Sequence, residues 1–195
     1  KFEFIPQMKP WFGDEEKSAV AQYLDGEVYL TEHKKTKEFE IAFSNIIGSK
    51  YCFAVNNGTV ALTIAGLAIN LKFGDEVIIP NYTMIATANA FKLLGCIPKF
   101  VDVNSSDYYL NSELIENAIS EKTKAIVVMN ANGRYPLTGM KQYTEIAKKY
   151  GLKLIEDAAQ SLGSYYPDGK HIGNHSDIST FSFSAPKIIS TGQGG

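Results

Sequence analysis

The sequence lacks the features that mark a membrane-spanning, secreted or nucleic-acid-binding protein. No apolar run reaches the roughly 18 residues that a membrane-spanning helix requires. The formal net charge is only −2, which gives little attraction for nucleic acid or an anionic membrane. The start, Lys1-Phe2-Glu3-Phe4, shows no charged-then-apolar signal pattern. We therefore expect a cytoplasmic protein that has neither nucleic acid nor a membrane as partner.

Cysteine is also scarce, and its two positions, Cys52 and Cys96, each lie in an apolar segment. This placement favours buried thiols over a disulfide and suits a reducing compartment. No metal site is expected. The chain is long enough for one domain with a substantial core, and its 45% hydrophobic and 21% charged residues are ordinary for a globular protein.

Short apolar or β-branched runs alternate with helical patterns along the chain. The predicted strands are Tyr51–Val55, Glu76–Pro80, Pro98–Val103, Ala125–Met129, Lys153–Glu156 and Ile178–Phe183. The predicted helices are 14–25, 35–47, 58–70, 84–94, 112–120 and 138–150. This alternation predicts an α/β fold with a mostly parallel sheet over about 51–195, with a helical segment of about 1–50 beside it. The helix after Gly58 has almost no polar face, so we expect it to be buried all round.

Three motifs follow predicted strands, and ligands bind at the carboxyl ends of strands in open parallel sheets. Asn57-Gly58-Thr59 opens a helix, whose N-terminus suits a phosphate. Asp157 ends a strand, where a carboxylate can pair with a cationic ring nitrogen. Lys187 follows a strand and a small-residue turn, and lysine forms Schiff bases with carbonyl cofactors. Each motif alone also fits an ordinary cap, turn or surface lysine, but together they match the three attachments that pyridoxal 5′-phosphate (PLP) requires.

The order and spacing of these motifs resemble the DegT/DnrJ/EryC1/StrS family of sugar-nucleotide aminotransferases, within the fold-type I PLP enzymes. Further segments that carry the resemblance are Glu38–Glu40, Gly58–Leu62, Gly74–Pro80, Thr83–Ala90, Phe100–Asp102, Thr123–Ile126 and Gly192–Gly195. The resemblance implies a three-layer α/β/α large domain and a homodimer with a shared active site. Because the chain stops within a motif, we expect the family's smaller C-terminal domain to be absent from it.

The resemblance assigns four residues to the cofactor ring. Lys187 would be the catalytic residue, forming the internal aldimine and moving protons. Asp157 would pair with the pyridine nitrogen, Gln160 would hydrogen-bond the ring 3-oxygen, and Ala159 would lie against one face of the ring.

The phosphate would be held by Gly58 and Thr59 with help from the hydroxyl of Ser182. Two positions depart from the family pattern. Met84 stands where an aromatic residue usually stacks on the ring, and a thioether controls that geometry less well. Asn130–Arg134 replaces a segment that usually contains histidine, and its role in substrate binding or dimer contact stays open.

The reaction implied by the resemblance moves an amino group from an amino acid, usually glutamate, to a nucleotide-linked keto-sugar. A 4-keto-6-deoxysugar is the favoured acceptor, in the biosynthesis of deoxyamino sugars such as those of lipopolysaccharide O-antigen. One alternative is a PLP-dependent sugar dehydratase of the same family, although those enzymes typically carry histidine at the position of Lys187. Another is an inactive fragment.

A different class of enzyme is the NAD-dependent short-chain dehydrogenase. Tyr166 and Lys170 have the Tyr-x-x-x-Lys spacing of those enzymes, which requires both residues on one helical face. Pro167 and Gly169 disfavour a helix at this point, and no Gly-x-Gly-x-x-Gly motif follows the first strand. We therefore predict a hairpin turn instead.

Overall fold

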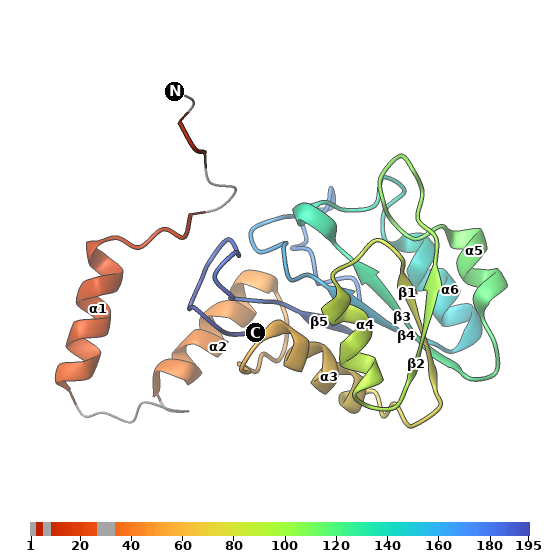
Figure 1. Cartoon of the computed structure of the whole chain (residues 1–195), viewed down its shortest axis with the longest axis horizontal. Helices are drawn as coiled ribbons and strands as arrows, with labels where there is room; N and C mark the ends of the chain where they lie inside the picture. Colours follow the sequence, from red (N-terminus) through yellow and green to blue (C-terminus); the bar gives the residue numbers. More distant parts are fainter. Residues whose placement is uncertain (1–2, 6–8, 27–33) are drawn as a thin grey trace.

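The computed structural model describes residues 3–5, 9–26 and 34–195 (Figure 1). Within that part of the chain, five strands form one sheet in the order β2-β1-β3-β4-β5. The strands are β1 (Glu76–Pro80), β2 (Ile97–Val101), β3 (Thr123–Met129), β4 (Lys153–Asp157) and β5 (Ile178–Thr180). All neighbouring strands run parallel. The predicted parallel α/β fold is therefore confirmed.

Helices lie where the sequence predicts them, with ends that differ by a few residues. They are α1 (Asp14–Asp25), α2 (Lys34–Ile47), α3 (Gly58–Ala68), α4 (Ile85–Lys92), α5 (Ser112–Ala118) and α6 (Lys141–Tyr150). A 3₁₀ turn, η1 (Ala131–Gly133), follows β3. Asn57 caps α3, because its side chain accepts a 2.9 Å hydrogen bond from the Val60 N–H. Gly151 ends α6 in the left-handed conformation, with φ +66°.

The central sheet separates two apolar cores. On β1, Val77 and Ile79 point to the side of α3 and α4, whereas Ile78 points to the side of α5 and α6. This alternation is the period-two geometry of a strand that is covered on both faces. Figure 1 shows the two helix layers on either side of the sheet. The arrangement confirms the predicted three layers.

The prediction of a strand over Tyr51–Val55 is wrong. The segment is not part of the sheet. Within the described residues its only strand-like pairing is at Val55, which exchanges backbone hydrogen bonds of 2.9 and 3.0 Å with Gly195. The side chains of Tyr51 and Phe53 are 69% and 74% exposed. Aromatic and β-branched residues favour a strand, but a strand also needs a partner along its length. A cavity of about 500 Å³ lies between this segment and β5.

The expectation that α3 is buried all round is also wrong. Leu62 and Ala65 are buried, but Ile64 and Leu67 on the same helix are 44% and 57% exposed. The sheet and α4 cover only one side of the helix, and the Thr63 hydroxyl donates to the Ala90 carbonyl across that contact at 3.2 Å. An apolar sequence shows that a helix avoids water, but not what covers each face.

Both cysteines are free thiols, as predicted. Cys96 is buried, whereas Cys52 is only half-buried because the segment around it lies outside the sheet. None of the described helices is long and apolar enough to span a membrane. α1 has no buried residue, and the division at about residue 50 into a helical segment and a sheet domain stays a prediction.

Candidate active site

Asp157 is the last residue of β4, at the carboxyl end of the sheet, and its side chain is only 3% exposed. Its carboxylate accepts a 2.7 Å hydrogen bond from the Thr87 hydroxyl and a 3.3 Å bond from the Ala159 N–H. Burial raises the pKa of this carboxyl, while the two hydrogen bonds and the charge of Lys187 oppose the rise. The site thus contains a buried carboxylate that a further positive group would stabilise.

Lys187 lies in a turn beyond β5, where its N–H donates to the Ser184 carbonyl at 3.0 Å. Its side chain is half-buried. β5 runs parallel to β4 with Thr180 opposite Asp157, so the chain that leads to Lys187 leaves the sheet at the end where Asp157 lies. The structure therefore places the two predicted ring contacts at one end of the sheet, although thirty residues separate them along the chain.

Gly58 and Ser182 are pressed together at the N-terminus of α3. A Cβ atom added to Gly58 would lie 2.9 Å from the Ser182 Cβ and 3.2 Å from the Phe181 carbonyl oxygen. Gly58 and Thr59 are the first two residues of the helix, whose N–H groups have no partner within a helix. The predicted phosphate contacts thus gather at one helix N-terminus, where an anion is favoured.

Gln160 follows Asp157 by three residues and contacts the loop after β3. Its Oε1 atom accepts a 2.7 Å hydrogen bond from the backbone N–H of Asn132. Because that bond engages the side-chain carbonyl oxygen, the amide NH₂ is the end of the side chain that can donate to a ligand. This orientation suits an anionic ring oxygen, the role predicted for Gln160. Ala159, between these two residues, is half-buried.

Met84 precedes α4 and has a 60% exposed side chain. The residues that follow Met84 and Lys187 in the chain are apolar and exposed as well: Ile85 (66%), Ile188 (66%) and Ile189 (53%). Within the described residues no hydrogen bond joins Met84 to Asp157 or Lys187, and its role on the ring stays a prediction.

The hairpin predicted at Tyr166–Lys170 is confirmed. The Tyr166 N–H donates to the Lys170 carbonyl at 2.8 Å, and Gly169 has a φ of +83°. Neighbouring Tyr165 and His171 form an antiparallel bridge. A tyrosine and a lysine on opposite arms of a hairpin do not share a helical face, so the dehydrogenase arrangement is not formed.

The 500 Å³ cavity beside β5 contains neither Asp157 nor Lys187 in its lining, so the candidate site lies elsewhere. The described residues contain no cluster of three or more histidine, cysteine, aspartate or glutamate side chains that could hold a metal.

Sequence reasoning missed the role of Thr87. This residue lies inside one of the segments that carry the family resemblance, and its hydroxyl also pairs with that of Thr83 at 2.8 Å. The signal in the sequence is two threonines four residues apart, one before α4 and one inside it. Its partner on β4 becomes visible only in the folded chain.

The chain is similar to known proteins along almost its whole length. The family model for the DegT/DnrJ/EryC1/StrS aminotransferase family matches residues 10–195. The uncharacterized protein MJ1066 of Methanocaldococcus jannaschii is 42% identical over 98% of this chain and 49% of its own length. GDP-perosamine synthase of Escherichia coli O157:H7 is 40% identical over 99% of this chain and 52% of its own length. The chain spans about half the length of these curated relatives.

Solved structures agree with the sequence comparison. A putative sugar aminotransferase of Streptococcus pneumoniae, Spr1654 in its PLP form, superposes with a TM-score of 0.91 at 28% identity. The superposition covers 98% of this chain and 52% of that one. The same protein has also been solved in apo and pyridoxamine phosphate (PMP) forms.

Proposed function

Because the chain belongs to the DegT/DnrJ/EryC1/StrS aminotransferase family, we propose that its full-length protein is a PLP-dependent sugar aminotransferase with Lys187 as the covalent attachment point. The observation that carries this proposal is the buried Asp157 carboxylate at the end of β4, beside the strand that leads to Lys187. Both lie at the carboxyl end of a parallel sheet, where ligands of such folds bind.

The residues present fit the cofactor. The Asp157 carboxylate is buried and accepts hydrogen bonds from one hydroxyl and one backbone N–H. A protonated ring nitrogen would offset the cost of keeping this carboxylate ionised. The helix N-terminus at Gly58 would hold the phosphate with Thr59 and Ser182. The close contact of Gly58 with Ser182 keeps a side chain from filling that position.

Bound PLP supplies an electron sink that stabilises negative charge on the carbon losing or gaining a proton. The protein's own groups then have separate tasks. Asp157 keeps the ring nitrogen protonated, and Gln160 donates to the ring 3-oxygen. Lys187, with its amine free, moves a proton at the reacting carbon as general acid and base.

For the substrates we propose glutamate as the amino donor and a nucleotide-linked 4-keto-6-deoxysugar as the acceptor. The 40% identity to GDP-perosamine synthase supports a sugar-nucleotide acceptor. A homodimer with a shared site is part of the proposal. It is supported by the exposed apolar side chains Met84, Ile85, Ile188 and Ile189 around the site, which a partner subunit would cover.

The decisive experiment locates the covalent bond. The full-length protein is incubated with PLP, reduced with borohydride, digested and analysed by mass spectrometry. The pyridoxyl label is expected on the peptide that contains Lys187. Lys187→Ala should lose the label, the yellow colour and amino transfer from glutamate to keto-sugar nucleotides, whereas Lys170→Ala, a change in the exposed hairpin, should keep all three. A label on another lysine, or full activity of Lys187→Ala, overturns the proposal.

A further inference from the structure

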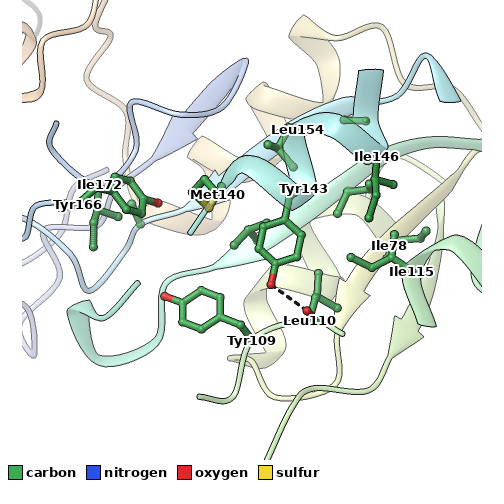
Figure 2. Close-up of a cluster of buried hydrophobic side chains, with 14 of the residues drawn as sticks. Ile78, Tyr109, Leu110, Ile115, Met140, Tyr143, Ile146, Leu154, Tyr166 and Ile172 are labelled. Atoms are coloured by element: carbon green, nitrogen blue, oxygen red, sulfur yellow. Dashed lines mark hydrogen bonds between the residues drawn. The ribbon is translucent and has the colours of Figure 1, made fainter. Parts of the chain in front are cut away.

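Tyr109 and Tyr143 are buried in the same core (Figure 2). Their hydroxyls make different hydrogen bonds. Tyr143 is fully buried, and its hydroxyl donates to the Leu110 carbonyl at 2.8 Å. Tyr109 is 2% exposed, and its hydroxyl lies 3.0 Å from Asn130 Oδ1 and 2.5 Å from the Arg134 carbonyl oxygen. Burial raises the pKa of both hydroxyls, so both remain protonated donors.

Asn130 stands at the end of β3 and uses all of its polar groups. Its N–H donates to the Asp157 carbonyl at 3.0 Å, and its carbonyl accepts from the Ser161 hydroxyl at 3.1 Å. Its side-chain amide donates to Glu156 at 3.0 Å, which leaves Oδ1 for Tyr109. A fully buried residue with every group engaged is held in one orientation.

The loop between Asn130 and Arg134 presses against Gln160. Asn132 has a φ of +56°, and this backbone conformation directs its N–H to Gln160 Oε1 at 2.7 Å. Gly133 has a φ of +69°, and a Cβ on it would lie 3.0 Å from the Gln160 carbonyl oxygen. The orientation of the Gln160 side chain therefore depends on the shape of this loop.

The Tyr109 hydroxyl contacts both ends of that loop with a single proton. The geometry points to Tyr109 as a positioning residue, which ties Asn130 to Arg134 so that the Asn132 N–H turns the Gln160 amide toward the ring oxygen of bound PLP. This inference rests on the proposed function, because it requires that PLP binds and that Gln160 contacts it.

The matched test compares Tyr109→Phe with Tyr143→Phe in the full-length protein. Each change removes one buried hydroxyl from the same core, so we expect similar losses of stability in urea unfolding. Only Tyr109→Phe should weaken PLP binding, by about two- to tenfold for the loss of one hydrogen-bonded link. It should also shift the pH titration of the visible absorbance of the bound cofactor.

The hydrogen-exchange rate of the Asn132 backbone amide tests the same link in the absence of cofactor. Tyr109→Phe should speed this exchange in the apo protein, and Tyr143→Phe should leave it unchanged. In a Gln160→Ala background, Tyr109→Phe should have no further effect on PLP affinity, because the residue through which it acts is gone. Should Tyr109→Phe fail to fold, Asn130→Ser removes the Asn130 end of the same link together with the amide that donates to Glu156. In that variant the Asn132 exchange and the absorbance titration, rather than the stability, should shift as expected for Tyr109→Phe.

The outcomes separate the two proposals. If the wild-type protein binds no PLP, the proposed function fails and this inference with it. If the wild type binds PLP but Tyr109→Phe matches Tyr143→Phe in affinity, absorbance and Asn132 exchange, only the positioning role is overturned. The positioning role is also overturned if Tyr109→Phe weakens PLP binding as much in the Gln160→Ala background as in the wild type.

Discussion

Thr87 of α4 donates a 2.7 Å hydrogen bond to the buried carboxylate of Asp157, 70 residues further along the chain. The Thr87 side chain is itself fully buried, and its oxygen pairs with that of Thr83. Thr83, Thr87 and Asp157 therefore form a short chain of hydrogen bonds, called here the threonine relay. It ends on the carboxylate that is proposed to face the cofactor nitrogen. This contact fixes the rotation of the Asp157 carboxylate.

Replacing Thr87 with valine keeps the shape of the side chain and removes the hydroxyl. We expect Thr87→Val to destabilise the cofactor-free protein by about 1–3 kcal/mol, because a buried carboxylate loses a partner. PLP affinity should also fall, since the carboxylate is no longer held in one orientation. Urea unfolding and PLP titration measure the two effects.

The matched control for this change is Thr123→Val. Thr123 is also buried, but it lies at the opposite end of the sheet, where its hydroxyl approaches Glu76 at 3.3 Å. This variant should lose stability and keep PLP affinity. Equal PLP affinity in Thr87→Val and Thr123→Val would contradict the claim that the threonine relay orients Asp157 for the cofactor.

The charge on Asp157 should make the cofactor-free protein sensitive to pH. Burial raises the pKa of this carboxyl above its ordinary 3.8, so the folded chain binds the proton more tightly than the unfolded chain. The resulting stabilisation is fully present below the ordinary pKa and is lost as pH rises through the folded pKa. Asp157→Asn is uncharged at every pH and keeps a similar shape.

We therefore expect Asp157→Asn to gain stability relative to the wild type as pH rises from about 4 to 7, measured by urea unfolding at each pH. PLP affinity should meanwhile fall about 10- to 100-fold, because a charged hydrogen bond is lost. A stability difference that stays constant over this pH range would show that the burial of charge at Asp157 is not the cause.

Some features of the site follow from residue type, whereas others exist only once the chain has folded. Residue type and position suggest Asp157 and Lys187 as site residues, because each lies at or beyond the end of a strand and carries its own chemistry, and their roles stay predictions. Thr87 and Tyr109 were not predicted, because their roles depend on contacts that only the fold creates. Tyr109 looks like an ordinary core aromatic in the sequence, and its polar partners come from the distant loop after β3.

The errors in the fold have a common physical origin. The expected strand at Tyr51–Val55 and the expected full burial of α3 both came from apolar content. Apolar content predicts burial but does not identify the covering element, and Phe53 and Leu67 remain exposed in the described chain.

The contact between Gly58 and Ser182 leaves no room for a methyl group. Gly58→Ala should destabilise the protein by about 1–3 kcal/mol through overpacking, because a Cβ would lie 2.9 Å from the Ser182 Cβ. The same displacement should weaken binding of PLP and of inorganic phosphate as a competitor. Gly26→Ala is the control, since a Cβ there would meet only ordinary contacts at 3.5 and 3.6 Å. Unfolding curves that coincide for the two variants would rule out the close packing.

Met84 gives the most direct test of how the cofactor ring is covered. Its side chain is 60% exposed, so Met84→Phe should leave the stability of the cofactor-free protein nearly unchanged. If Met84 lies over the ring, an aromatic replacement gains a stacking interaction and should tighten PLP binding by about two- to tenfold. Ile85→Phe is the matched control, because Ile85 is the neighbouring residue and is 66% exposed. PLP titration of the two full-length variants should show tighter binding for Met84→Phe alone. Equal affinities would mean that another group, from this chain or from a partner subunit, covers the ring.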